Sequence, residues 1–200
     1  MLWRTARIVY AWRTAWGKQS WARSLRGLTL DAASVISFWQ AARAKGLDIC
    51  IDGGWAVDAL LGRQTRPHND LDIALPADQV PELMALLTAD GFHIVDRPDS
   101  WAHNFVLEDD TGRCIDVHSY ILNDDETSAG GVPYEAQHLR GEGRIQGHLI
   151  RCVPPEWLVQ FHTGYEINDK DWHDVRLLCQ HFNIDIPDIY DRFLKSTSGG

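Results

Sequence analysis

The stretch 51–75 constrains the fold more than any other part of this chain, and it reads IDGGWAVDALLGRQTRPHNDLDIAL. It ends in DLDIAL, where Asp70 and Asp72 alternate with apolar residues. Successive side chains of a strand point to opposite faces, so the two aspartates share one face and the apolar residues share the other. The pattern predicts a strand with a hydrophobic core on one side and a polar site on the other.

Two carboxylates on one strand face lie only about 7 Å apart along the backbone, so they repel each other unless a positive charge lies between them. Mg²⁺ suits this position because it binds one or two carboxylates and completes its shell with water and substrate phosphates. Taken alone, Asp70 and Asp72 are equally compatible with solvated aspartates on the open face of a sheet.

The glycine pair Gly53–Gly54 favours the metal interpretation. It stands between an expected strand and an expected helix, where small residues let a phosphate approach backbone N–H groups at the positive end of the helix dipole. A lone glycine pair is usually only a turn, but here a D-x-D pattern follows sixteen residues after Gly54. The combination indicates a phosphate site beside a metal site.

A third carboxylate follows in residues 113–118, RCIDVH, where Asp116 falls on the polar face of another alternating strand. If this strand lies beside the D-x-D strand, the two backbones are about 4.8 Å apart and the three acids converge on one point. The predicted metal ligands are therefore Asp70, Asp72 and Asp116.

Three strings of the sequence, GGWAVDALLGRQTRPHNDLDIAL, IDVHSYILNDD and FHTGYEINDKDWHD, resemble the short lincosamide O-nucleotidyltransferases. More distantly they resemble the aminoglycoside 2''-O-adenylyltransferases, and the resemblance runs from about Leu28 to about Ile184. It implies an α+β fold with a polymerase β-like nucleotidyltransferase core, a mixed sheet with helices on one side, and a small helical C-terminal part. Gly54 stands where the wider superfamily often has Ser, so backbone N–H groups would replace a hydroxyl contact to phosphate.

The resemblance implies transfer of AMP from Mg·ATP to a hydroxyl of a lincosamide, with release of pyrophosphate. Mg²⁺ would be held by Asp70 and Asp72, and Asp116 would act as the general base and as a further ligand. Loss of Asp70 or Asp72 is then expected to cost more activity than loss of Asp116. The residues expected to bind the nucleotide are Gly53, Gly54, Arg66 and His68, although Arg66 is equally suited to pairing with a site carboxylate.

Three rival functions are compatible with the sequence. Aminoglycoside 2''-O-adenylylation would use the same catalytic residues and differ in its acceptor contacts. A protein-modifying, antitoxin-like nucleotidyltransferase would transfer AMP to a partner protein, but such proteins usually lack a helical C-terminal part. A non-catalytic nucleotide-binding module is disfavoured by the presence of all three aspartates.

Charge is distributed unevenly over the 200 residues. The first 28 hold six basic residues and no acid, which leaves 13 basic and 28 acidic residues, a net charge of −15, for the remainder. An acidic body disfavours nucleic acid and attracts a cationic small molecule, such as an antibiotic that carries amines. Residues 1–27 are expected to be disordered or a surface helix, residues 28–153 the nucleotidyltransferase domain and residues 154–200 a helical region.

The four cysteines have no C-x-x-C spacing, so we expect free thiols and a cytoplasmic protein. No apolar run in residues 1–27 approaches the roughly 20 residues that span a bilayer. A homodimer would suit a small split site, although no residue demonstrates one. The expected helices are 31–45, 55–61 and 76–90, the expected strands are 47–51, 92–95 and 104–108, the expected hairpin is 144–153, and 123–143 is expected to be a loop on the acceptor side of the site.

Overall fold

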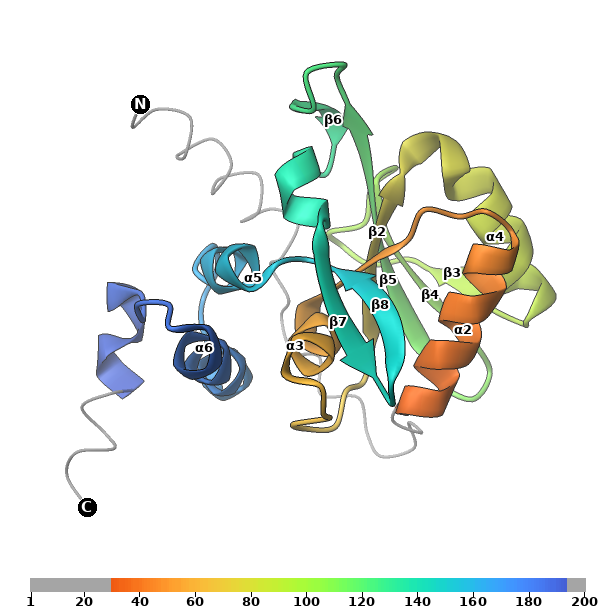
Figure 1. Ribbon diagram of the computed structural model, residues 1–200. Coiled ribbons are helices and arrows are strands. Elements are labelled where there is room, and N and C mark those ends of the chain that lie inside the picture. The colour runs from red at the N-terminus through yellow and green to blue at the C-terminus, as the bar shows by residue number, and fades with distance from the viewer. Residues whose placement is uncertain (1–29, 194–200) are drawn as a thin grey trace.

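The computed structural model describes residues 30–193, so segment 1–27, predicted above to be disordered or a surface helix, lies outside the described residues. The described chain forms an α+β structure around one mixed sheet (Figure 1). Its α-helices are α2 (Ala32–Ala44), α3 (Gly53–Leu61), α4 (Val80–Ala89), α5 (Pro155–Phe161) and α6 (Asp169–Phe182). Its strands are β1 (Cys50–Asp52), β2 (Leu71–Pro76), β3 (His93–Val95), β4 (Asn104–Glu108), β5 (Cys114–Leu122), β6 (Ser128–Gly131), β7 (Gly141–Ile145) and β8 (His148–Cys152).

The sheet has the strand order β3-β4-β5-β2-β1-β8-β7, and β6 pairs separately with β5. In its centre β1 runs antiparallel to β2, whereas β2 runs parallel to β5. The two strands that carry the predicted acids are thus direct neighbours, as expected. A parallel pair needs a long crossover, and α4 with the β3–β4 hairpin lies between β2 and β5 in the chain.

One face of the central strands is apolar and fully buried. Ile51, Ile73 and Val117 stand side by side in register across β1, β2 and β5, and none of them is exposed to solvent. In Figure 1, α2 and α4 lie together on one side of the strands, and α3, α5 and α6 gather on the other. The predicted α+β fold with a mixed sheet is confirmed, but the helices of the core are not confined to one side as predicted, because α3 lies opposite α2 and α4.

Local sequence signals explain where several helices begin and end. Asp31 caps α2 by accepting a hydrogen bond from the N–H of Ser34, and Asn168 caps α6 in the same way. Gly62 ends α3 in the left-handed conformation, with φ of 67°. The β7–β8 turn has positive φ at both Gln146 and Gly147, which matches the right-handed twist of the two strands.

Some predicted boundaries were wrong by a few residues. The first strand covers only Cys50–Asp52, although Leu47 and Ile49 before it are buried. Helix α3 begins at Gly53 rather than at residue 55, because Asp52 is its N-cap. Helix α4 begins at Val80, after a short 3₁₀ turn (Ala77–Gln79).

The segment 123–143 is not the loop that its polarity predicted. Its strand β6 pairs with β5, and Val132, Tyr134, His138 and Leu139 are buried. Tyr134 donates a hydrogen bond to the carboxylate of Asp52 at 2.5 Å. The segment is therefore anchored to the core by a few large buried side chains, although the residues between them in the sequence are polar.

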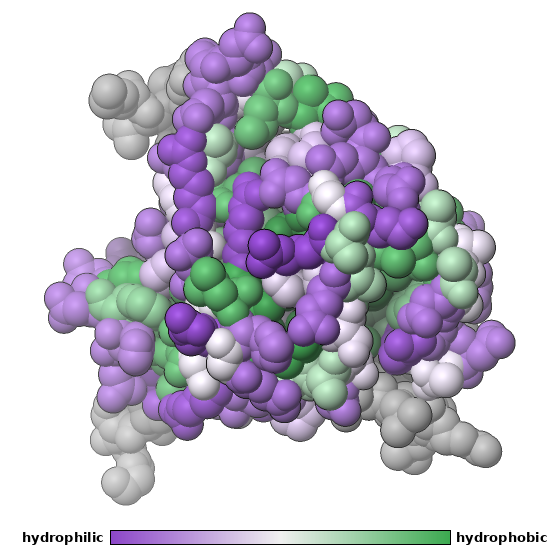
Figure 2. Space-filling model, turned by 45° about the vertical axis from the view of Figure 1, so that its right-hand side comes forward, coloured by the Kyte–Doolittle hydropathy of each residue, from purple (hydrophilic) through white to green (hydrophobic). Residues whose placement is uncertain are grey.

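Hydrophobic residues on the surface are dispersed. In Figure 2 they form separate patches among hydrophilic residues on the face shown. The large exposed ones come from different parts of the chain: Ile94, Trp101, Ile121, Leu149 and Ile189. Among residues 30–193, no helix has the length and apolar character needed to cross a membrane.

Candidate active site

Three aspartates form a row across the centre of the sheet. Asp52 on β1 is in register with Asp72 on β2, which is in register with Asp116 on β5. Side chains directly opposite each other share a face, so all three carboxylates lie on the face that does not carry Ile51, Ile73 and Val117. Their exposed fractions are 0%, 4% and 9%, so the row is almost shielded from water.

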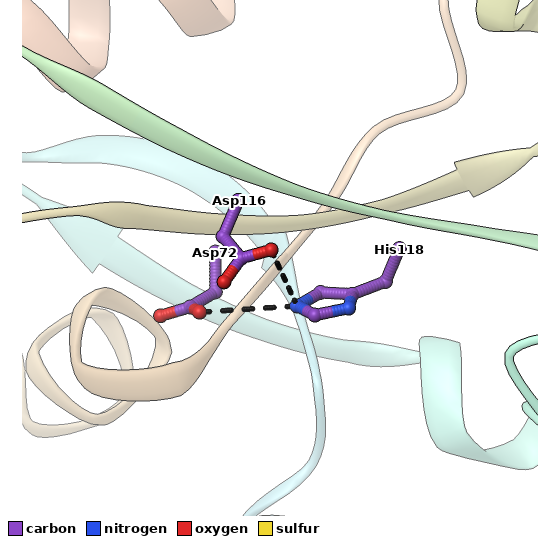
Figure 3. Close-up of side chains that lie close together, drawn as sticks. All are labelled: Asp72, Asp116 and His118. Atoms are coloured by element: carbon purple, nitrogen blue, oxygen red, sulfur yellow. Dashed lines mark ion pairs between the residues drawn. The ribbon is translucent and has the colours of Figure 1, made fainter. Parts of the chain in front are cut away.

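His118 completes the cluster, as Figure 3 shows. It lies two residues after Asp116 on β5 and therefore on the same face. Its Nε2 atom is 3.7 Å from Oδ1 of Asp116 and 3.8 Å from Oδ1 of Asp72. Ligand atoms of Asp72, Asp116 and His118 all lie within 4.8 Å of one another.

The charges in this cluster influence one another strongly. Burial alone would lower the pKa of His118, but the carboxylates of Asp116, Asp72 and Asp52 outweigh it, and the pKa is raised. Burial raises the pKa of Asp52, although the Tyr134 hydroxyl and the Gly53 N–H both donate to its carboxylate. The site thus concentrates negative charge and needs a positive group.

The glycine turn lies directly against this row. Asp52 accepts a hydrogen bond from the Gly53 N–H at 2.7 Å and so begins α3. Gly53 has φ of 58°, in the left-handed region that glycine tolerates best. A methyl group placed on Gly53 would overlap the carboxylate of Asp72. Glycine is therefore required here both by the backbone conformation and by the close approach to Asp72.

Arg66 and His68 lie beside Gly54, and both are held by carboxylates. The Nε2 atom of His68 is 2.5 Å from Oδ2 of Asp58, and both side chains are buried. Arg66 forms a bidentate pair with Asp174 of α6, with Nη2 to Oδ2 at 2.6 Å and Nε to Oδ1 at 2.9 Å. The carboxylate partner of Arg66 thus comes from the C-terminal region and is not one of the predicted metal ligands.

The structure brings most of the predicted site residues together. Asp72, Asp116 and Gly53 meet at one point, with Gly54, Arg66 and His68 adjoining them. Asp70 lies just before β2 and is half-buried. Within residues 30–193 it does not belong to the group of metal-ligating atoms that contains Asp72.

The predictions from sequence missed several residues that shape the site. Asp52 follows an apolar run and precedes two glycines, so an N-cap signal was available for it. His118 fell on the polar face of its strand, but the spacing gave it no role. No local signal marked Asp58, Asp174 or Tyr134. The partners of Asp174 and Tyr134 are 108 and 82 positions away in the chain, and that of Asp58 is 10 positions away.

The cluster fits a divalent cation. Carboxylate oxygens and an imidazole nitrogen are donors used by divalent metals, and the buried negative charge would favour a cation. The overlap that any side chain at Gly53 would make with Asp72 shows that the turn and the carboxylate are closely packed. A ligand bound at the turn would therefore lie next to the metal position.

Comparison with known proteins points the same way. The family model for aminoglycoside-2''-adenylyltransferase matches residues 34–178, a span that includes every residue of the cluster. A lincosamide resistance protein of Staphylococcus haemolyticus is 28% identical over 134 residues, 64% of this chain and 81% of the relative. A 2''-aminoglycoside nucleotidyltransferase of Escherichia coli is 30% identical over 146 residues, 70% of this chain and 80% of the relative.

Solved structures share the fold. The lincosamide antibiotic adenylyltransferase LnuA with bound lincomycin aligns with a TM-score of 0.66 at 24% identity, covering 76% of this chain and 98% of that one. ANT(2'')-Ia in complex with adenylyl-2''-tobramycin aligns with a TM-score of 0.62 at 25% identity, covering 76% and 88%. The chain therefore belongs to the aminoglycoside-2''-adenylyltransferase family and is a nucleotidyltransferase of the antibiotic-resistance type.

Proposed function

We propose that this protein transfers AMP from ATP to a hydroxyl of a lincosamide antibiotic and releases pyrophosphate, with Mg²⁺ as its metal. The observation that carries the proposal is the contact between the Gly53 turn and Asp72, within a cluster that also contains Asp116. It joins a helix N-terminus suited to phosphate with carboxylates suited to a metal.

Each residue near the turn has a distinct task in this proposal. Asp72 and Asp116 hold the metal, and Asp70 contributes from the edge of the same face. The metal, when bound, neutralises phosphate charge and stabilises the leaving pyrophosphate. Since the Gly53 N–H already donates to Asp52, backbone contacts to phosphate begin at Gly54.

Asp116 takes the proton from the acceptor hydroxyl. It is the most exposed of the three aspartates in the row, at 9%, and stands at its outer end on β5. A carboxylate with an ordinary pKa near 4 is a weak base in water, so this step contributes about 10² to 10⁴ in rate. Positioning of the two substrates supplies the larger share.

Arg66 and His68 support the nucleotide side of the site. In this structure the Arg66 guanidinium is engaged by Asp174, and the His68 imidazole lies against the carboxylate of Asp58. They act by packing against Gly54 and holding the turn in place, and the Arg66 guanidinium adds positive potential beside the phosphates.

A second candidate acceptor is an aminoglycoside. The matching family model is that of aminoglycoside-2''-adenylyltransferase, and the relatives at 30% identity are 2''-aminoglycoside nucleotidyltransferases. Both drug classes carry amines that are protonated near neutral pH, so the acidic body of the chain suits either one. The mechanism is the same for both, and only the acceptor differs.

The test is pyrophosphate release from Mg·ATP by the purified protein, with lincomycin, clindamycin, kanamycin and tobramycin each as acceptor. Release with a lincosamide alone is the expected result, and release with an aminoglycoside alone would move the proposal to the second acceptor. Release with none of the four above the level of an Asp72→Asn variant would refute both. Mass spectrometry of the product should show the added AMP.

A further inference from the structure

We propose that His118 is a direct nitrogen ligand of the metal that Asp72 and Asp116 hold, so that the site combines carboxylates with an imidazole. Compared with a site made only of carboxylates, such a site shifts the metal preference from Mg²⁺ toward a transition-metal dication such as Mn²⁺ or Co²⁺. The inference rests on the proposed function only for the presence of a divalent cation.

The strand register places the imidazole where a ligand is needed. His118 follows Asp116 by two residues on β5, so the two side chains emerge on one face. The residue opposite His118 on β2 is Ala74, whose methyl group leaves room above the strand. The ring extends toward Asp72, two positions earlier on β2, and Figure 3 shows its nitrogen directed at both carboxylates.

The separations suit one shared ion. Metal–ligand bonds to nitrogen and oxygen are about 2.0–2.2 Å, so two atoms bound to the same ion lie no more than about 4.4 Å apart. The Nε2 atom of His118 is 3.7 Å from the Asp116 oxygen and 3.8 Å from the Asp72 oxygen. An ion between the three groups could reach all of them after only small side-chain movements.

Donor chemistry then determines which ion is favoured. Mg²⁺ prefers oxygen ligands in a strict octahedron, whereas imidazole nitrogen binds the later first-row metals well. For a given set of nitrogen and oxygen donors, affinity rises from Mn²⁺ to Co²⁺ and on to Cu²⁺. A buried histidine between two aspartates therefore moves the preference of the site away from Mg²⁺.

A purely electrostatic role for His118 is the rival explanation. A protonated imidazole would neutralise the carboxylates without touching a metal, and it would have to leave or lose its proton before a cation bound. The two explanations differ in one observable, which is whether a nitrogen nucleus is bonded to the metal. Activity alone would not distinguish them, since either role would reduce turnover when lost.

The experiment is pulsed EPR of Mn²⁺ bound to the full chain in the presence of inorganic pyrophosphate, which brings no nitrogen. The wild type, His118→Gln and the matched control His148→Gln are compared. His148 is exposed on β8 and belongs to no metal-ligating group among residues 30–193. Mn²⁺ and Mg²⁺ affinities are measured on the same samples.

We expect ¹⁴N coupling to Mn²⁺ in the wild type and in His148→Gln, and its loss in His118→Gln. Removal of outer-shell partners costs about 10- to 100-fold in metal affinity, so loss of this ligand should weaken Mn²⁺ binding at least about tenfold. Mg²⁺ binding should weaken less. Absence of coupling in the wild type, or its persistence in His118→Gln, would overturn the proposal.

If His118→Gln does not fold, absence of ¹⁴N coupling in the wild type still overturns the proposal. Failure of this inference is also separable from failure of the proposed function. AMP transfer without nitrogen coupling would remove only the histidine ligand, and nitrogen coupling without transfer to any acceptor would remove only the proposed reaction. A wild type that binds no Mn²⁺ at all would overturn the metal site itself.

Discussion

Arg66 and Asp174 lie 108 positions apart in the chain and form a bidentate ion pair across the structure. The guanidinium Nη2 donates to Oδ2 at 2.6 Å and Nε donates to Oδ1 at 2.9 Å. Asp174 is 1% exposed and Arg66 21%. Since Arg66 also lies against Gly54, the pair connects helix α6 to the glycine turn.

Replacement of Asp174 by Asn should destabilise the protein because it leaves the half-buried guanidinium without its counter-charge. Removing one partner of a buried pair costs about 3–5 kcal/mol, and the partial exposure of Arg66 reduces this to roughly 2–4 kcal/mol. Urea unfolding near neutral pH measures the change. Arg63→Gln, in the exposed part of the same loop, should alter stability by no more than about 0.5 kcal/mol. Equal effects of the two variants would contradict a structural role for the pair.

Gly54→Ser places a side chain at the glycine turn, and we expect it to be harmful. A methyl group on Gly54 would lie 2.5 Å from Nδ1 of His68 and 2.6 Å from Nη2 of Arg66, both of which are held by carboxylates. Overpacking of this kind costs about 1–3 kcal/mol. Thermal and urea unfolding, together with the KM for ATP, provide the readouts.

Gly130→Ser is the control for that variant, because a side chain there would meet only Ile121 at ordinary contact distance. It should leave the free energy of unfolding within about 0.5 kcal/mol of the wild type. If Gly54→Ser proves as stable and as active as the control, Arg66 and His68 do not pack against the turn as described.

Loss of Asp72 should reduce turnover more than loss of Asp116. Asp72 lies in the middle of the row, in register with an aspartate on each side, and touches the glycine turn. Asp116→Asn removes the proposed base and should reduce kcat by about 10² to 10⁴. Asp72→Asn should fall below that level in steady-state pyrophosphate release. Asp110→Asn, in the exposed β4–β5 turn, should retain full activity. Equal residual rates for Asp72→Asn and Asp116→Asn would refute the ordering.

Asp109 gives a prediction about pH that does not depend on the active site. Its carboxylate accepts hydrogen bonds from the N–H and hydroxyl of Thr111 and from the N–H and Nε of Arg113. Burial alone would raise the pKa of Asp109, but these bonds outweigh it and hold the pKa below its ordinary value. The ionised form therefore stabilises the folded hairpin.

A depressed pKa contributes stability that is complete above the unfolded pKa of about 3.9 and is lost as pH falls through the folded pKa. The wild type should thus be more stable than Asp109→Asn by about 1–3 kcal/mol near pH 7, and the difference should shrink steadily in acid below about pH 4. Urea unfolding of both proteins across this range tests the trend. A difference that stays constant with pH would mean that charge at Asp109 does not stabilise the turn.

Alternation of residue types predicted much of the fold. The aspartates of DLDIAL and RCIDVH were assigned to polar faces because a strand has a period of two. The register of β2 against β5 confirms that assignment for Asp72 and Asp116, whereas Asp70 lies just before β2. Turn residues located the β4–β5 and β7–β8 hairpins, since Asp109, Gly112 and Gly147 adopt conformations that suit tight turns. These features depend on neighbours within a few residues.

The segment 123–143 shows where local patterns were insufficient. Its composition is polar, yet Tyr134 and His138 are buried against residues from β1 and α5. Burial of a few aromatic side chains outweighs the polarity of the residues around them, and the partners that bury them are distant in sequence. A short stretch of sequence does not show which distant residues will bury its aromatic side chains.

By itself, the sequence determined which side chains share a strand face, where the glycine turn lies and which acids could bind a metal, because backbone geometry and steric limits act locally. Only the tertiary structure decided that Asp52 and His118 join Asp72 and Asp116, and that Asp174 holds Arg66. Those contacts depend on strand register and on the docking of α6, which are set by hydrophobic burial over the whole chain. Local sequence patterns thus indicate which residues are candidates for the site, whereas the packed fold determines which of them come into contact.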